Sequence, residues 1–204
     1  MATQKRKADS KKRSYHHGDL RAALVTAALR LIDRHGIKGF SLKDAAAAAG
    51  VSTAAPYRHF ADKDALLAAI QQEGFSGFNA ALAEAYANAN TAQSKIVELG
   101  VAYVRFALEH PAHFRLMFSM SAAKTPGPEM GDSGFRLLVE AVDRLRPDAH
   151  PEWRNDLVVV CWSVVHGYAV LVLDGALTMT TGIDDPEAHL RRALALLIGS
   201  DSKR

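Results

Sequence analysis

The sequence predicts an all-α protein with a small N-terminal helical domain and a larger C-terminal helical domain. In most segments the apolar residues recur every three or four positions, which is the spacing of one face of an amphipathic helix. Serine, threonine, aspartate or proline stands at most of the expected helix starts. No segment has the alternating pattern or the hairpin turns that are typical of β-strands. We place the two domains at residues 14–62 and 63–204, after a separate segment at residues 1–13.

The chain is long enough for a buried core. It has 204 residues, of which 49% are hydrophobic, and this allows one large domain or two modest ones. Cys161 is the only cysteine, so an intrachain disulfide is impossible and a reducing compartment fits. The basic N-terminus lacks the apolar run of about 7 to 15 residues that a secretory signal needs. We therefore expect a cytoplasmic protein.

The positive charge is concentrated in the N-terminal part. Residues 1–63 hold 13 Lys and Arg against 5 Asp and Glu, a net charge of +8, whereas residues 64–204 hold 12 against 17, a net charge of −5. A domain that faces nucleic acid is expected to be positive, because neutralised phosphates release counterions. Residues 1–13 are expected to be a disordered basic arm. The arm either follows the DNA backbone or enters the minor groove, or it is a solubilising tail, and both hypotheses stay open.

The first three helices are expected to form a compact unit. A first helix runs from Asp19 to about Arg34, and Gly36 follows it as a stop. Ser41 is a good N-cap for a second, alanine-rich helix that ends at Gly50. Ser52 caps a third short helix that continues to His59, and Phe60 closes its apolar side. Two short helices joined by a tight glycine-containing turn are typical of the helix-turn-helix, whose second helix lies in the major groove of DNA.

The amino-acid sequence of this segment resembles that of one protein family. Gly50-Val51-Ser52, then Tyr57-Arg58-His59-Phe60, then Lys63 at the head of the next helix, is similar to the tetracycline-repressor (TetR) family of bacterial transcription regulators. The resemblance implies a repressor that binds a palindromic operator as a homodimer and is released by a small-molecule effector. Pro56 stands where the family commonly has a bulky aliphatic residue, and at the edge of the first turn we expect its cost to the helix to be small.

The resemblance also assigns roles to side chains. The residues expected to contact DNA are Ser41, Lys43, Thr53, Ala54, Ala55, Tyr57, Arg58, His59 and Lys63. Thr53 and the two alanines point into the groove, where a thymine methyl accepts apolar contact. Arg58 either reads a guanine or holds a phosphate. Tyr57, His59 and Lys63 position the protein on phosphates, although His59 has a purely packing role as its alternative.

The C-terminal part is predicted to consist of helices separated by short breaks. Asp62 caps a long helix from Lys63 to near Asn88 or Asn90, and Gly74 and Gly77 either permit a bend in it or allow close packing. The later elements, in chain order, are a helix from Thr91 to about His110, a helix opened by Pro111, a mobile loop at Ser121–Ser133, and helices at Phe135–Leu145, Glu152–Leu173 and Pro186–Ile198.

The apolar run Leu157–Leu173 is the nearest approach to a membrane span. It has about 17 residues, whereas a span needs about 20, so we expect it to be buried at a subunit interface instead. Its Trp162 to Gly167 segment resembles the Trp-His-Gly subgroup of TetR-like regulators, as does His110 to Ser119. That resemblance implies a four-helix dimer interface from residues 152–173 and 186–198. Leu190, Ala193, Leu194 and Leu197 form an apolar stripe that is expected to face the partner.

The effector is expected to be a small apolar or amphipathic molecule bound in the C-terminal core. The candidate lining is aromatic and sulfur-rich: Tyr103, Phe106, Phe114, Met117, Phe118, Met120, Trp162, His166 and Tyr168. The alternative is that each of these is an ordinary core residue. Trp162 and His166, four positions apart on one helix face, are the first pair to test.

Two other classes of function are alternatives to a sequence-specific regulator. An enzyme is disfavoured, because no nucleophile, base and orienting group can be assembled and no catalytic residue or cofactor motif is found. No metal site is expected, since His110 and His113, or His16 and His17, lack carboxylate or cysteine partners nearby in sequence. A nucleoid-type protein that binds DNA without sequence preference stays as the second alternative.

Overall fold

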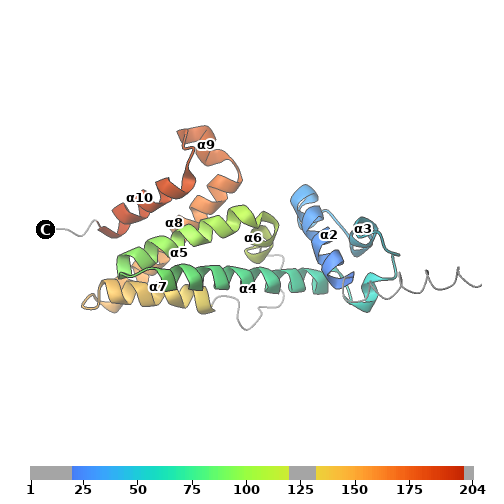
Figure 1. The fold of residues 1–204 in the computed structure, drawn as a ribbon, viewed down its shortest axis with the longest axis horizontal. Coiled ribbons are helices and arrows are strands. Elements are labelled where there is room, and N and C mark those ends of the chain that lie inside the picture. The colour runs from blue at the N-terminus through green and yellow to red at the C-terminus, as the bar shows by residue number, and fades with distance from the viewer. Residues whose placement is uncertain (1–19, 120–131, 200–204) are drawn as a thin grey trace, which may run out of the picture.

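The computed structural model describes residues 20–119 and 132–199, and all regular structure within these ranges is helical (Figure 1). The all-α prediction is confirmed. A small group of helices, called the head below and comprising residues 20–62, lies at one end of an elongated molecule. A larger helical body follows it, and helix α4 (Lys63–Asn88) runs from the head along the body. The expected arm at residues 1–13 lies outside the described residues.

The head begins with α2 (Leu20–His35) and α3 (Leu42–Ala48). Ser41 caps α3 as predicted, and Asp44 completes a capping box: its carboxylate accepts the backbone N–H of Ser41 at 2.7 Å. Gly50 has a φ of +70°, a left-handed conformation that favours glycine, and it turns the chain after α3. Both ends of α3 are therefore specified by local chemistry that can be recognised in the sequence.

The core of the head extends beyond the predicted boundary at residue 62. Phe60 is 4% exposed, and it packs in one cluster with Leu66 and Ile70 of α4 and with Leu116, from a helix much later in the chain. Helix α4 starts at the predicted N-cap, where the Asp62 carboxylate accepts the N–H of Ala65 at 2.8 Å. The beginning of α4 thus belongs to the head and its remainder to the body.

Close packing explains one of the two glycines inside α4, which is continuous. A Cβ added at Gly74 would lie 2.9 Å from Met117 Sδ, so a glycine is needed for the approach of the later helix. At Gly77 the added Cβ would lie 3.5 Å from Phe106 Cε2, an ordinary contact.

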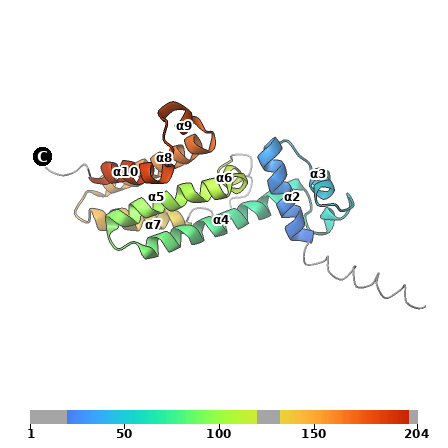
Figure 2. The ribbon, with the colours of Figure 1, turned by 45° about the horizontal axis from the view of Figure 1, so that its top comes forward.

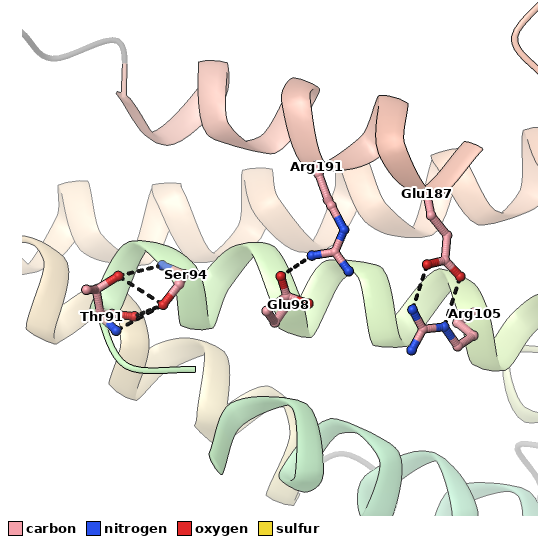
Figure 3. A network of polar contacts seen from close by, with 6 residues as sticks. All are labelled: Thr91, Ser94, Glu98, Arg105, Glu187 and Arg191. Carbon is pink, nitrogen blue, oxygen red and sulfur yellow. Dashed lines mark hydrogen bonds and ion pairs between the residues drawn. The ribbon is translucent and has the colours of Figure 1, made fainter. Parts of the chain in front are cut away.

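The body is built around α5 (Ala92–Glu109), which contacts α4, α7, α8 and α10 (Figure 2). The other helices are α6 (Pro111–Met117), α7 (Asp132–Leu145), α8 (Pro151–Leu173), α9 (Ala176–Thr181) and α10 (Pro186–Gly199). Thr91 and Ser94 form a capping box at the start of α5 (Figure 3). The predicted Ser121–Ser133 loop falls largely outside the described residues, and its last two positions belong to α7.

Two elements differ from the sequence prediction. The break before residue 186 contains the short helix α9, bounded by Gly175 and Gly182 with φ of +70° and +68°. The α10 stripe that was expected to face a partner faces α5 instead, since Leu190 and Leu194 are fully buried in the body core. Periodicity identified the buried face of α10 but could not tell an intrachain partner from a second chain.

Helix α10 is held on α5 by both apolar and ionic contacts. Arg105 donates two hydrogen bonds to Glu187, at 2.9 Å from Nε and 2.6 Å from Nη2, and Arg191 pairs with Glu98 (Figure 3). The Arg105 guanidinium lowers the pKa of Glu187. These pairs are partly exposed and add little to stability on their own, but they fix the register of the two helices.

Gly100→Ala is expected to lower the melting temperature, because the new Cβ would overlap Leu194 Cδ1 and lie 3.1 Å from Val165 Cγ2. Overpacking of a core costs about 1–3 kcal/mol. Gly77→Ala is the matched control in the neighbouring helix α4, where alanine is favoured over glycine by about 1 kcal/mol. Thermal unfolding should therefore rank Gly100→Ala below wild type and Gly77→Ala at or above it. The reverse order would contradict the described packing of α5 on α10.

Candidate nucleic-acid interface and internal cavity

The recognition segment of the head, Ser52 to His59, is less regular than the single short helix predicted there. It consists of turns and one short 3-10 helix, η1 (Pro56–Arg58), so the predicted helix is shorter than expected and does not begin at Ser52. The physical reason is Pro56, which has no N–H to donate to Ser52 O. Ser52 O accepts the N–H of Ala55 instead, at 3.0 Å, which is the tighter 3-10 pattern. The Pro56 ring is fully buried and anchors the segment to the head.

Most residues predicted to contact DNA lie on the surface of the head. Those that are exposed are Ser41, Lys43, Thr53, Ala54, Tyr57 and Arg58, and those that are half-buried are Ala55, His59 and Lys63. Tyr57 is 53% exposed, although its side chain carries a large aromatic ring that could be buried in a core. Ser41 already has a structural role, since its hydroxyl donates to Asp44 at 2.7 Å. The segment therefore presents short side chains beside one tyrosine and one arginine.

Lys63 is tied to the head rather than extended into solvent. Its Nζ donates to Phe40 O at 2.6 Å and lies 4.3 Å from the centroid of the Phe40 ring. Burial lowers the pKa of Lys63, while Asp64 and Asp44 act in the opposite direction. An ammonium group has three N–H donors, and Phe40 O takes one of them. The contact places a positive charge at the N-terminus of α4, next to the recognition segment.

Lys63→Ala is expected to weaken binding to all DNA sequences to a similar extent and to lower the slope of log affinity against log salt by about one. The reason is that a charge placed at a helix N-terminus meets phosphate and carries no base preference. The measurement is a titration at several salt concentrations, with Lys38→Ala, an exposed lysine before Phe40, as the control. A loss confined to one base pair would contradict the assignment.

The body contains a cavity of about 460 Å³ between α4, α5, α7 and α8. Four of the predicted lining residues lie on its wall: Tyr103, Met117, Phe118 and Trp162. Three do not. Phe106 and Phe114 are buried in the surrounding core, and His166 lies behind Tyr103. Tyr168 is also elsewhere, with its hydroxyl donating to Pro186 O at 2.9 Å, and Met120 lies outside the described residues.

Sequence reasoning missed much of the cavity wall. Among the lining residues it missed are Phe75, Phe78, Asn79 and Leu82 of α4 and Phe135 and Leu138 of α7. The missed α4 residues recur at three- and four-residue spacing opposite the exposed face, and this signal was available. The pattern was not linked to the cavity, because nothing in the sequence shows that α4 borders it.

A polar pair stands at the cavity wall. The hydroxyl of Tyr103 lies 2.8 Å from Nδ1 of His166, and the Tyr103 ring is in edge contact with Phe78. Burial raises the pKa of Tyr103 and lowers the pKa of His166. Both groups are therefore uncharged at neutral pH.

Helix α6 joins the cavity to the head. On one side Ala112 and Leu116 belong to the core of the head, and on the other Phe114 and Met117 belong to the core of the body. Met117 also lines the cavity, and its carbonyl accepts a hydrogen bond from the buried Gln71 at 3.3 Å. A displacement of Met117 would thus change the packing of the head.

Helix α8 carries an exposed apolar face. The exposed large apolar side chains on it are Trp153, Val159, Val160, Trp162, Val164, Val170 and Leu171. Among the described residues, α8 is also the one helix that is long and apolar enough to cross a membrane, by length and composition alone. Of its most apolar 18-residue stretch, 28% is buried inside the protein. Within the same residues, no group of three or more His, Cys, Asp or Glu is placed to hold a metal ion.

An N-terminal helix-turn-helix head on a helical body with a cavity defines a class of DNA-binding transcription regulators. The comparisons agree with this class. Residues 24–70 match the model of bacterial regulatory proteins of the tetR family, and residues 96–197 match the model of the tetracyclin repressor-like C-terminal domain. The chain belongs to the TetR family. It is a regulator and not an enzyme.

Solved structures show the same fold. A protein of unknown function from Rhodococcus sp. RHA1 is 31% identical, with 91% of this chain and 97% of that chain covered and a TM-score of 0.73. A tetR-family bacterial regulatory protein from Rhodococcus RHA1 is 20% identical, with 88% and 95% covered and a TM-score of 0.70. A TetR family transcription regulator from Marinobacter aquaeolei VT8 is 21% identical, with 95% and 100% covered and a TM-score of 0.68. Among curated proteins, no sequence matches this chain.

Proposed function

We propose that the protein is a cytoplasmic repressor that binds a palindromic operator as a homodimer and releases it when a small molecule enters the cavity. The observation that carries the proposal is the exposed recognition segment on a basic head. Residues 20–63 hold seven Lys and Arg against three Asp and Glu, and Tyr57 and Arg58 stand exposed at its turn. Two heads related by a two-fold axis would meet successive major grooves, about one helical turn apart.

The homodimer is supported by the exposed face of α8. Val160, Val164, Gly167 and Leu171 follow one another at spacings of four, three and four, so they lie along one stripe. The three larger side chains of this stripe are 42%, 38% and 47% exposed. Exposed apolar stripes of this kind mark interfaces. A second copy of α8 would cover the stripe. The apolar face of α8 would then be buried between two chains without any contact with lipid.

Gly167 gives independent support for a close partner. An added Cβ there would meet nothing within 4 Å, so no contact among the described residues requires a glycine. Glycine inside a helix costs about 1 kcal/mol relative to alanine. A facing helix that approaches the backbone closely would account for it. On α10 the exposed Leu196, at 75%, would face the partner in place of Leu190 and Leu194, for which this role was predicted.

Effector release is supported by the position of α6 between the cavity and the head. A ligand shifts an equilibrium only when it binds one state better than the other. Because Met117 lines the cavity and Leu116 packs in the head, a ligand that moves α6 would change the spacing of the two heads in the dimer. The DNA-bound spacing would then be disfavoured, and the operator would be released.

The experiment that tests the proposal is selection of bound duplexes from a random DNA pool by the purified protein. We expect enrichment of a two-fold symmetric sequence with half-sites about one turn apart. Enrichment of no sequence would overturn the proposal in favour of a nucleoid-type protein that binds without sequence choice. An enriched sequence without symmetry would overturn the homodimeric part alone.

A further inference from the structure

The wall of the cavity is free of charge among the described residues. Its polar contributors are few: the Asn79 amide, the Tyr103 hydroxyl, the Cys161 thiol and the Trp162 indole. The rest is aliphatic or aromatic, with the rings of Phe75, Phe78, Phe118 and Phe135 among them. An ionised group that enters an apolar site without a partner loses its hydration and gains nothing in return. The wall therefore disfavours a charged ligand group and favours an apolar body.

The Tyr103 hydroxyl is the best-placed polar group for recognition. It belongs to a side chain that is 6% exposed, and its oxygen has one hydrogen and two lone pairs. The Trp162 indole N–H donates to the Tyr103 oxygen and takes one of its lone pairs. When His166 Nδ1 accepts, Tyr103 donates to it and keeps the other lone pair for a ligand donor. When Nδ1 carries the hydrogen, Tyr103 accepts from it and keeps its own hydrogen for a ligand acceptor. A ligand hydroxyl satisfies both arrangements, because it donates and accepts.

We propose that the effector is an uncharged, largely apolar molecule with a hydroxyl group that hydrogen-bonds to Tyr103, backed by His166. The cavity of about 460 Å³ suits a body of two or more rings, and the surrounding rings offer edge contacts to it. The inference rests on the proposed function, in that it names the chemical class that would relieve repression. The expected ligand preference concerns binding to the cavity alone, so it can be tested without DNA.

Three probes of one shape test the inference by equilibrium dialysis: biphenyl-4-ol, biphenyl and biphenyl-4-carboxylate. We expect the full-length protein to bind biphenyl-4-ol about 5-fold more tightly than biphenyl, as one hydrogen bond provides. Biphenyl-4-carboxylate is expected to bind at least about 10-fold more weakly than biphenyl-4-ol, because its charge has no partner. Equal or tighter binding of the carboxylate overturns the inference, and so does the absence of binding by all three probes.

Two matched variants locate the contact. Tyr103→Phe removes the hydroxyl and keeps the ring, and it should erase the preference for biphenyl-4-ol over biphenyl while biphenyl itself still binds. Tyr168→Phe removes a hydroxyl from the same domain, but one that is bonded to Pro186 O and faces His189. It should leave the preference intact. A ratio of the two affinities within one variant cancels any general loss of stability, so a preference that persists in Tyr103→Phe overturns the assignment.

The failure of this inference is distinguishable from the failure of the proposed function. If biphenyl-4-ol binds with the expected preference but the affinity for the selected operator is unchanged at saturation, the cavity chemistry stands and effector release fails for this class. If the carboxylate binds best and releases the operator, release stands and the neutral class is wrong.

Discussion

Replacing Val164 and Leu171 together by glutamate is expected to convert the protein from a dimer to a monomer. The two side chains are 38% and 47% exposed on the α8 stripe, and four negative charges would meet across a two-fold axis. A monomer contacts a single half-site, so the affinity for the palindrome should fall by about 100-fold or more. Sedimentation equilibrium gives the mass, and an operator titration gives the affinity.

Ala83→Glu on the exposed face of α4 is the control for this change, since it adds one glutamate, half of the added charge, away from the stripe. It should leave both the mass and the operator affinity as they are. If the double variant stays dimeric, the interface lies elsewhere, and the α8 stripe needs another occupant. If it becomes monomeric but binds the palindrome unchanged, the dimer is not the DNA-binding form.

Arg58→Ala is expected to relax sequence preference at one base pair in each half-site, at a cost of about 1–3 kcal/mol per half-site. Arg58 is exposed at the end of η1, and the residues before it offer a threonine hydroxyl and alanine methyls to base edges, beside Tyr57, which is assigned to phosphate. The measurement is the affinity for operators that carry each base at each position. The uniform loss expected for Lys63→Ala provides the comparison, because both changes remove one positive charge. A uniform loss from Arg58→Ala would make it a phosphate contact instead.

The parts of the fold that depend on local chemistry were predictable from the sequence. The N-caps at Ser41, Asp62 and Thr91 each make the expected hydrogen bonds, and Pro111 opens α6. These features rest on neighbours within a few residues, which a sequence displays directly. The same holds for the boundaries of the long helices, which differ from the predicted ones by a residue or two, except that α7 begins three residues before the predicted start at Phe135.

The features that depend on distant partners were predicted less well. One local effect was also underestimated: Pro56 was expected to disturb its helix little, yet its missing N–H accompanies turns and a short 3-10 helix in the recognition segment. Leu190 and Leu194 were assigned to a second chain because an apolar stripe does not name its partner. For the cavity, the sequence identified aromatic residues on α5, α6 and α8 but could not tell the wall from the core behind it.

A consequence of the η1 geometry is that few side chains are available for direct base contact. Sequence-dependent shape of the DNA, or contacts from residues 1–13, would then contribute to operator choice beside Thr53 and Arg58. Removal of residues 1–13 would separate these two sources.

We propose that two heads of one dimer read a symmetric operator. The most direct test is the affinity of the purified protein, at one fixed physiological salt concentration, for the selected palindrome, for the same duplex with one half-site reversed, and for random DNA. We predict two chains per palindrome, an affinity at least about 1,000-fold above that for random DNA, and loss of most of this advantage when one half-site is reversed. Equal affinities for the palindrome and random DNA would contradict the account.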